Sequence, residues 1–338
     1  MQTVSDLPRH LTYPRLRENV WHIVPSHEEA LLITADGQYE VPTEEALTFL
    51  KMRSYCNGHH TLEAVAERSG LSLEKVRDVI QSLDQIQVVR GPEEATGQLD
   101  VTVVRQKFKT ICDIWAGELQ AGYIGNDFVR GDLPKEALIG WLLEMYHYIS
   151  DFPHAIQHAA NHAEGELKKV LDRYAQEEMN HDVFVLRTLE KLGVSEAEAR
   201  ASTPMLSTRM IGFTMRELYE IEPSTVLMVA AMLEAQEFNE EAIEHFKQKL
   251  AGFYGIDPAA FKPYFDHQEI DVGLGHAELL NDNLHLIEVT DVEKLNVITN
   301  KLHDIKHAFD LQGVEIREYY QSLNGKYIPR QKVDFAAI

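Results

Sequence analysis

The sequence has 338 residues, of which 44% are hydrophobic and 25% charged, and a formal net charge of −22. These fractions are typical of a globular protein and exclude a disordered chain, while the length provides for one large domain or two ordinary ones. The acidic balance excludes nonspecific nucleic-acid binding, which needs clustered Lys and Arg, and docking on anionic lipid. We therefore expect no nucleic acid and no membrane among the partners.

The N-terminal stretch MQTVSDLPRHLTYPRLREN has no apolar run, so we do not expect a signal peptide. No later stretch reaches the roughly 18 uninterrupted apolar residues of a membrane span. The two cysteines, Cys56 and Cys112, are far apart in the sequence and make no disulfide framework. From these three features we expect the protein to be located in the reducing environment of the cytoplasm.

Residues 1–95 mix strand and helix signals. Segments 20–25 and 29–42 are predicted to be strands, with Asp36-Gly37 as the hairpin turn. Three helices are predicted to follow. The first has Thr43 as its N-cap, the second runs from Thr61 to Gly70, and the third has Ser72 as its N-cap. A small sheet with three helices is the layout of a winged-helix-like α+β domain.

The stretch 91–100 is polar and rich in turn formers, which predicts a linker. From about residue 102 onward the pattern is nearly all helical. The predicted helices are 102–121, 134–161, 164–192, 206–221, 224–250, 258–280 and 291–323. Residues 96–338 are therefore predicted to form a bundle of about seven helices, and the fold class is mainly α.

The helix predicted over 164–192 carries two polar residues within its apolar stripe. Glu178 and His181 take the positions that follow Tyr174, and the stripe resumes at Val185. An unpaired buried carboxylate costs several kcal/mol, so this pattern requires a partner. A metal ion, a salt bridge or a water-filled pocket could each supply it.

The helix predicted over 134–161 repeats this Glu-x-x-His spacing at Glu144 and His147, among residues that are apolar on almost every side. The two side chains are either part of a thin solvent-facing stripe or an inward polar lining. The same region carries His154, His158 and His162 at helical spacing, and this row is predicted to face solvent.

The helix predicted over 224–250 offers a third candidate. Glu234 falls on the same stripe as Leu227 and Ala231, where Leu or Met would be expected. Glu237 lies on a row that continues into further glutamates and is predicted to face solvent. Glu234 is therefore the candidate and Glu237 the reserve.

The helix predicted over 258–280 offers the last candidates. His267 and Asp271 are four residues apart and share one helical face, where they could also form a structural pair. His276 follows five residues after Asp271, which rotates it off that face in an undistorted helix. Gly273 and Gly275 could accommodate a π-bulge or kink that returns it.

Four predicted helices thus each offer an inward carboxylate, and three also offer a histidine. Helical bundles that combine Glu from some helices with Glu-x-x-His from others hold di-iron and di-manganese sites. Carboxylates are hard ligands suited to iron, and imidazoles fill further positions while others stay open for dioxygen. We expect Fe(II)/Fe(III), as two ions, with manganese as the alternative metal.

Several of these runs resemble the heme-oxygenase-like di-iron oxidases and oxygenases, relatives of the TenA and PqqC proteins. They are WLLEMYHYISDFP, YAQEEMNHDVFVLRTLEKLG, STPMLSTRMIGFTMRELYEIEPSTVLMVAAMLE and HQEIDVGLGH, within roughly residues 105–325. The resemblance implies a bundle of about seven helices. It also implies metal ligands at Glu144 (together with His147), Glu178, His181, Glu234, His267, Asp271 and one further histidine. The family usually shows His-x-x-x-Asp-x-x-His, whereas here Leu274 stands at the last position and the nearest histidine is His276.

Residues 1–95 resemble the PqqD-like peptide-recognition domain, also called the RiPP recognition element, in their order of hairpin and three helices. The resemblance implies binding of a precursor or leader peptide by strand addition. The alternatives are a degenerate winged helix used for dimerisation or packing and a DNA-binding helix-turn-helix. Residues 1–100 contain nine Lys/Arg against sixteen Asp/Glu, which makes DNA a poor partner.

Together these features predict a non-heme iron oxidase or oxygenase that activates O₂ to modify a ribosomally made peptide. Its electrons would come from an external reductant or from the substrate. Hydroxylation, N-oxygenation, C–C cleavage and desaturation remain open, as does the oligomeric state, a homodimer included. The rival hypotheses are a metal-free oxidase of the PqqC type, a non-catalytic peptide-binding scaffold and a histidine-ligated heme protein.

Overall fold

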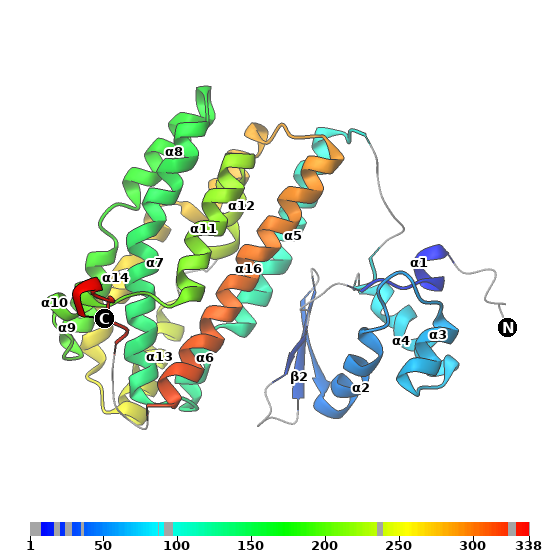
Figure 1. The fold of residues 1–338 in the computed structure, drawn as a ribbon, viewed down its shortest axis with the longest axis horizontal. Helices are drawn as coiled ribbons and strands as arrows, with labels where there is room; N and C mark the ends of the chain where they lie inside the picture. The colour runs from blue at the N-terminus through cyan, green and yellow to red at the C-terminus, as the bar shows by residue number, and fades with distance from the viewer. Residues whose placement is uncertain are drawn as a thin grey trace. The chain divides into compact units, whose positions relative to one another are not determined.

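The computed structural model describes residues 8–16, 21–23, 29–34, 37–86, 88–90, 97–234, 239–323 and 329–337 (Figure 1). The chain divides into two compact units. Unit 1 comprises Met1–Thr96 and Asp113–Ala121, and unit 2 comprises Gly97–Cys112 and Gly122–Ile338. Asp36 of the predicted hairpin turn, most of the predicted linker and Glu237 lie outside the described residues.

Unit 1 contains a three-stranded antiparallel sheet in the order β1-β2-β3. Its strands are β1 (Trp21–Ile23), β2 (Glu29–Thr34) and β3 (Gly37–Pro42). Its helices are α1 (Arg9–Thr12), α2 (Thr43–Arg53), α3 (Leu62–Ser69) and α4 (Leu73–Gln85). Strands and helices therefore lie at the positions that the sequence predicted. The core joins buried side chains of α2, α3 and α4, among them Met52, Val65 and Ile80.

One of the two predicted N-caps is confirmed, since the Ser72 side chain accepts a hydrogen bond from the Lys75 N–H. Thr61, where the second helix was predicted to start, caps α3 by accepting a hydrogen bond from the Ala64 N–H. Thr43 is instead the first residue of α2, and Pro42 occupies the N-cap position. The prediction failed there because proline, whose φ is fixed, lets the helix begin directly after strand β3.

The regular elements among the described residues of unit 2 are all helices. Its longer helices are α5 (Val101–Gly122, shared with unit 1), α7 (Lys135–His162), α8 (Gly165–Glu177), α9 (Asp182–Lys191), α11 (Leu206–Ile221), α12 (Thr225–Leu233), α13 (Glu240–Tyr254), α14 (Lys262–Leu274) and α16 (Val292–Gln321). Shorter elements are α6 (Gly125–Arg130), α10 (Glu196–Ala201), η2 (Pro258–Phe261), η3 (His276–Glu278), α15 (Leu279–Asp282), η4 (Leu284–Leu286) and η5 (Phe335–Ala337).

Helix α7 lies at the centre of this bundle. It packs against α8, α9, α11 and α16, and Figure 1 shows α7, α11 and α16 side by side. Buried aromatic rings fill the space around Trp141, whose ring centroid lies 5.5 Å from that of Tyr264 and 5.8 Å from that of Phe128. Gly140 allows a close approach, because a Cβ atom there would lie 2.1 Å from the Tyr320 ring of α16.

Three predicted helices are interrupted, which corrects the expectation of about seven continuous ones. The helix predicted over 164–192 breaks between α8 and α9, where Asn180 adopts a positive φ of 69°. The helix predicted over 224–250 has a break after Leu233, and the one predicted over 258–280 ends at Leu274. Gly275 follows with a φ of 77°, a left-handed conformation that terminates a helix. Periodicity alone does not detect such breaks, because the apolar spacing resumes after each of them.

Among the described residues, no helix combines the length and the apolar character needed to cross a membrane.

Candidate metal centre

Four of the predicted ligands lie at the interruptions of the helices. Glu178 directly follows α8, His181 directly precedes α9 and Glu234 directly follows α12. His276 is the first residue of η3, one position after the left-handed Gly275. Side chains at helix ends can converge on one point from different directions, which residues on parallel helical faces cannot do as freely.

These side chains form two groups that share Glu178. The first, here called the Glu234 group, consists of Glu178, Glu234 and His276, and the second, the His267 group, consists of Glu178, His181 and His267. Within each group, one ligand atom from each residue lies within 4.8 Å of the others. The structure therefore brings together five of the eight predicted ligands.

The Glu234 group is centred on the imidazole of His276. Its Nδ1 atom lies 2.9 Å from Oε1 of Glu178 and 2.9 Å from Oε2 of Glu234. Both Glu178 and His276 are buried, with 5% and 2% of their surfaces exposed. On its other side, the His276 Nε2 atom lies 3.4 Å from Oε2 of Glu177.

The His267 group uses the other oxygen of Glu178. Oε2 of Glu178 lies 3.3 Å from Nδ1 of His181, and that nitrogen lies 3.0 Å from Nε2 of His267. The rings of His181 and His267 meet edge to face, with centroids 4.6 Å apart. The Glu178 carboxylate thus faces the Glu234 group with one oxygen and the His267 group with the other.

Three atoms of the Glu234 group fit a cation better than they fit one another. Oε1 of Glu178, Oε2 of Glu234 and Nδ1 of His276 are all buried, and none of them has a hydrogen bond of acceptable angle. They lie at ion-pair distance, but one N–H cannot point at two carboxylate oxygens at once. Buried polar atoms without aligned partners are costly, and a metal ion at their common focus would satisfy all three. The donor set, carboxylates and imidazoles without thiolates, suits iron or manganese.

The charges of the metal-free protein follow the same arrangement. Burial lowers the pKa of His276, but the carboxylates of Glu178 and Glu234 outweigh burial and raise it to about 10. Burial raises the pKa of Glu178, yet His181 and His276 outweigh burial and lower it to about 2. Burial and the charge of Glu178 raise the pKa of Glu234. The imidazolium of His276 is therefore the counter-charge of Glu178, whereas burial favours the neutral form of Glu234.

His267 has the opposite electrostatic character. Burial, reinforced by the neighbouring His181, lowers its pKa to about 4. A neutral imidazole carries a free lone pair, which is the form in which histidine binds a metal. No proton has to leave His267 before it can act as a ligand at neutral pH.

Tyr174 supports the Glu234 group from α8. Its hydroxyl donates a hydrogen bond to Oε1 of Glu234, so that Oε2 is left facing His276. The ring centroid of Tyr174 lies 4.9 Å from that of His276 in an edge-to-face contact. The negative charge of Glu234 also contributes to the raised pKa of two further buried tyrosines, Tyr148 and Tyr219. Sequence reasoning missed Tyr174, because a tyrosine on an apolar stripe has the pattern of a packing residue.

Glu144 and His147, which the sequence also offered as ligands, belong to neither group. The Glu144 carboxylate accepts hydrogen bonds from the N–H of Met205, at 3.0 Å, and from the Thr208 hydroxyl. Met205 is the N-cap of α11, where free N–H groups favour a negative charge. Nε2 of His147 lies 2.8 Å from the Ser202 hydroxyl. Both side chains are thus partners of the chain that leads into α11.

Two further predictions concern α14. Asp271 lies within α14, but its side chain is outside those that the structure describes. Of the π-bulge or kink expected at Gly273 and Gly275, no π-bulge forms, but the chain does turn at Gly275 and brings His276 back to the site. The helix ends instead, Leu274 is 43% exposed, and the chain reverses so that His276 enters the site from η3.

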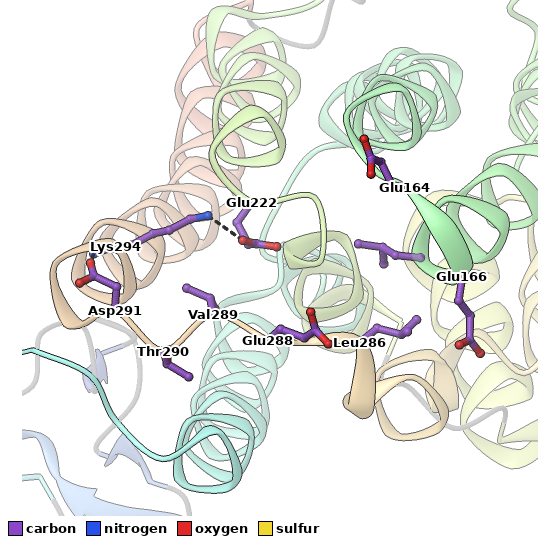
Figure 2. A pocket seen from close by; sticks show the side chains of 10 residues that line it. Glu164, Glu166, Glu222, Leu286, Glu288, Val289, Thr290, Asp291 and Lys294 are labelled. Carbon is purple, nitrogen blue, oxygen red and sulfur yellow. Dashed lines mark hydrogen bonds and ion pairs between the residues drawn. The ribbon is translucent and has the colours of Figure 1, made fainter.

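A pocket of about 590 Å³ lies apart from this centre (Figure 2). Its polar lining is mostly acidic and comprises Glu164, Glu166, Glu222, Glu288, Thr290, Asp291 and Lys294. Figure 2 shows the ion pair across it, in which Nζ of Lys294 lies 2.8 Å from Oε2 of Glu222. None of the lining residues belongs to the Glu234 group or the His267 group.

One family model matches the part of the chain that carries the two groups. Residues 139–300, which run from α7 into α16, match a family described as iron-containing redox enzymes. The matched segment contains all five residues of the two groups. A search of curated proteins finds no match.

Solved structures are similar to about two thirds of the chain. A domain of unknown function with a heme oxygenase-like fold from Shewanella denitrificans OS217 has a TM-score of 0.53 and 18% identity, covering 68% of this chain and 97% of that chain. A TenA homologue from P. horikoshii OT3 has a TM-score of 0.45 and 17% identity, covering 65% and 99%. A TenA homologue from Pseudomonas syringae pv. tomato has a TM-score of 0.47 and 11% identity, covering 66% and 99%.

The first of these similarities shows a heme oxygenase-like helical fold, as the sequence resemblance implied. The chain thus contains a heme oxygenase-like helical fold, and its residues 139–300 are similar to iron-containing redox enzymes. The number of metal ions and the PqqD-like character of residues 1–95 stay predictions.

Proposed function

We propose that the protein is a non-heme iron oxidase or oxygenase that activates O₂ at the centre formed by the Glu234 and His267 groups. The observation that carries this proposal is the position of Glu178, a buried carboxylate with one oxygen in each group. Carboxylates that bridge two ions are characteristic of di-iron sites in helical bundles. Two ions are therefore the proposed occupancy.

Each group supplies a different ligand set. Glu178, His181 and His267 provide two imidazoles and one carboxylate, the composition of many Fe(II) oxygenase sites with open positions. Glu178, Glu234 and His276 provide two carboxylates and one imidazole. We include Asp271 as a ligand by resemblance. In this proposal His276 replaces the histidine that the family usually has where this chain has Leu274.

The chemistry that iron supplies when bound is the reduction of O₂ and the oxidation of a substrate. The chain's own residues hold the metal ligands in place and keep bulk water away, since Glu178, His181 and His276 are all buried. Tyr174 fixes one oxygen of Glu234, which leaves the other free to bind the cation. The two groups supply three protein ligands per ion, and Asp271 would add a fourth at one of them, which still leaves coordination positions for O₂ and substrate.

The proposed substrate is a ribosomally made peptide whose leader is held by residues 1–95. Support comes from the sheet order of unit 1, in which β1 and β3 are the edge strands. An edge strand offers backbone donors and acceptors to which an extended peptide can add. The PqqD-like resemblance assigns this role, and an external reductant would complete the reaction.

The test is anaerobic loading of the purified chain with Fe(II), followed by elemental analysis and exposure to O₂. We expect two iron ions per chain, O₂ consumption, and loss of both in Glu178→Ala. If Glu178→Ala and His181→Ala keep their iron, the assignment is wrong. If the chain still oxidises a substrate after exhaustive chelation, the hypothesis of a metal-free oxidase replaces that of an iron enzyme. Binding of peptide without O₂ consumption by the iron-loaded chain would support the scaffold hypothesis instead.

A further inference from the structure

Three residues outside the candidate metal centre form another cluster of ligating side chains. His158 and His162 lie one turn apart near the end of α7, and Glu220 lies near the end of α11. One ligand atom from each lies within 4.8 Å of the others. Nε2 of His158 lies 3.0 Å from Oε1 of Glu220. Unlike Glu178 and His276, these side chains are exposed or half-buried.

The His162 ring is held in a form that is ready to bind a metal. Its Nδ1 atom lies 2.9 Å from the backbone carbonyl oxygen of His158. Because a carbonyl oxygen only accepts hydrogen bonds, Nδ1 carries a hydrogen, and Nε2 is the nitrogen of this ring that can bind a metal. Metal-binding histidines commonly have this arrangement, in which the second ring nitrogen donates to a carbonyl and fixes the orientation of the ring.

Side-chain contacts join the two helices that carry the cluster at several points along their length. Glu144 of α7 contacts Thr208 of α11, and farther along both guanidinium nitrogens of Arg216 bond Asp151, at 2.6 and 2.7 Å. The pair of His158 and Glu220 continues this series in the same direction. The ligands from both helices are thus held in position before any ion binds, which lowers the cost of binding.

We propose that His158, His162 and Glu220 form a surface site for a divalent transition-metal cation, with Zn²⁺ as the best fit. Two imidazoles and one carboxylate make a common three-ligand set for zinc, and a fourth position would remain open. Cu²⁺ and Ni²⁺ suit the same imidazoles. A bound cation would take the place of the proton between His158 and Glu220 and would tie the end of α7 to α11. This site is independent of the proposed iron chemistry.

The test is a titration of the purified chain with Zn²⁺ in competition with a chromophoric indicator. His162→Ala removes one ligand, and His154→Ala is the matched control, since His154 is an exposed histidine of the same helix that lies outside the cluster. We expect His162→Ala to weaken Zn²⁺ binding at this site at least tenfold and His154→Ala to change it less than twofold. The proposal would be overturned if the wild type and both variants bound Zn²⁺ with equal affinity, or if both variants lost the same amount of affinity for Zn²⁺.

A second measurement separates this site from the buried centre. Cu²⁺ added to the iron-loaded chain should give an electron paramagnetic resonance signal with hyperfine coupling to two imidazole nitrogens. The double variant His158→Gln/His162→Gln should lose that coupling while its iron content and circular dichroism stay unchanged. If the double variant keeps the two-nitrogen signal, Cu²⁺ binds elsewhere and the site does not exist.

Discussion

Nδ1 of His276 lies 2.9 Å from Oε1 of Glu178, although the two residues come from elements that are far apart in the sequence. This contact exists because α14 ends at Leu274 and Gly275 turns the chain back toward α8. It brings His276 into the site, although the spacing of the resembled family would place this histidine at the position of Leu274. The first two predictions depend on this contact.

His276→Ala should remove one of the two proposed iron ions. The Glu234 group would keep only its two carboxylates, whereas the His267 group would keep all of its ligands. Elemental analysis after anaerobic Fe(II) loading should fall from two ions per chain to one. His285→Ala serves as the control, because His285 is exposed and lies in neither group. An unchanged iron content would show that His276 is not a ligand.

Metal binding should release a proton from His276. Its pKa of about 10 means that this imidazole is protonated at neutral pH in the metal-free protein, so a cation has to displace that proton. The dissociation constant should therefore rise about tenfold for each unit by which the pH is lowered below 8. Calorimetry in buffers of different ionisation enthalpy counts the released protons. We expect the His276→Ala variant to release one proton fewer than the wild type. Equal proton counts for the two proteins would show that His276 does not lose a proton to the bound metal.

Glu144→Gln should keep its iron and gain stability at high pH. Burial raises the pKa of Glu144 to about 7, well above the usual value for a glutamate, so the native state favours the protonated carboxyl. The stability that the native state gains from the protonated Glu144 is fully present below the pKa of this residue in the unfolded chain. It is lost as the pH rises through the pKa of Glu144 in the folded protein. At about 1.4 kcal/mol per pH unit, the wild type should lose about 2 to 3 kcal/mol between pH 5 and pH 8 relative to the variant.

Urea unfolding of both proteins at the two pH values measures this difference. The glutamine carbonyl can still accept from the Met205 N–H and the Thr208 hydroxyl, so the fold should be kept. Loss of iron in Glu144→Gln would instead restore the ligand role that the sequence pattern suggested.

Tyr174→Phe should alter the iron site without emptying it. The variant removes the hydrogen bond to Oε1 of Glu234, which frees that carboxylate to rotate or to bind the metal through both oxygens. We expect two iron ions per chain with a changed Mössbauer spectrum, and a loss of about 1 to 3 kcal/mol in stability from the unpaired carboxylate oxygen. Tyr254→Phe is the control, since its hydroxyl bonds the Leu133 carbonyl at 2.9 Å, outside both groups. Identical spectra for Tyr174→Phe and wild type would exclude a positioning role.

Gly140→Ala should destabilise the bundle. The added methyl group would meet the Tyr320 ring at 2.1 Å, so α7 and α16 would have to separate. Overpacking of this kind typically costs about 1 to 3 kcal/mol. Gly252→Ala on α13 is the matched control, because no described heavy atom beyond its own helix neighbours lies within 4 Å of the added Cβ. It should be neutral or stabilising by up to about 1 kcal/mol, since alanine favours a helix. Equal unfolding midpoints for the two variants would contradict the close packing.

Much of the helical framework could be read from local pattern. Helix α11 spans Leu206–Ile221, the range predicted from apolar spacing, and the cap at Ser72 was visible as a single residue. The same pattern marked Glu178 and His181 as polar residues on a buried face. Local pattern succeeds there because spacing and capping are properties of neighbouring residues.

The helix breaks were harder to predict. Asn180 and Gly275 both have positive φ values, and both lie beside residues of the candidate centre. An asparagine within an otherwise helical run does not by itself predict a break, although it tolerates a left-handed conformation better than most residues. Positive φ at an asparagine beside buried polar groups is a signal that could direct attention to such a site.

By itself, the sequence determined which segments are helical and which buried positions need a polar or ionic partner, because both follow from spacing and from the cost of burying charge. Only the tertiary structure decided who the partners are. Glu144 and Glu178 have the same local pattern. The Glu144 carboxylate nevertheless accepts a hydrogen bond at the N-terminus of α11, whereas the Glu178 carboxylate lies beside His181 and His276. A periodic pattern shows that a face is covered, but the covering groups come from distant parts of the chain, and only the packing of the helices brings them there.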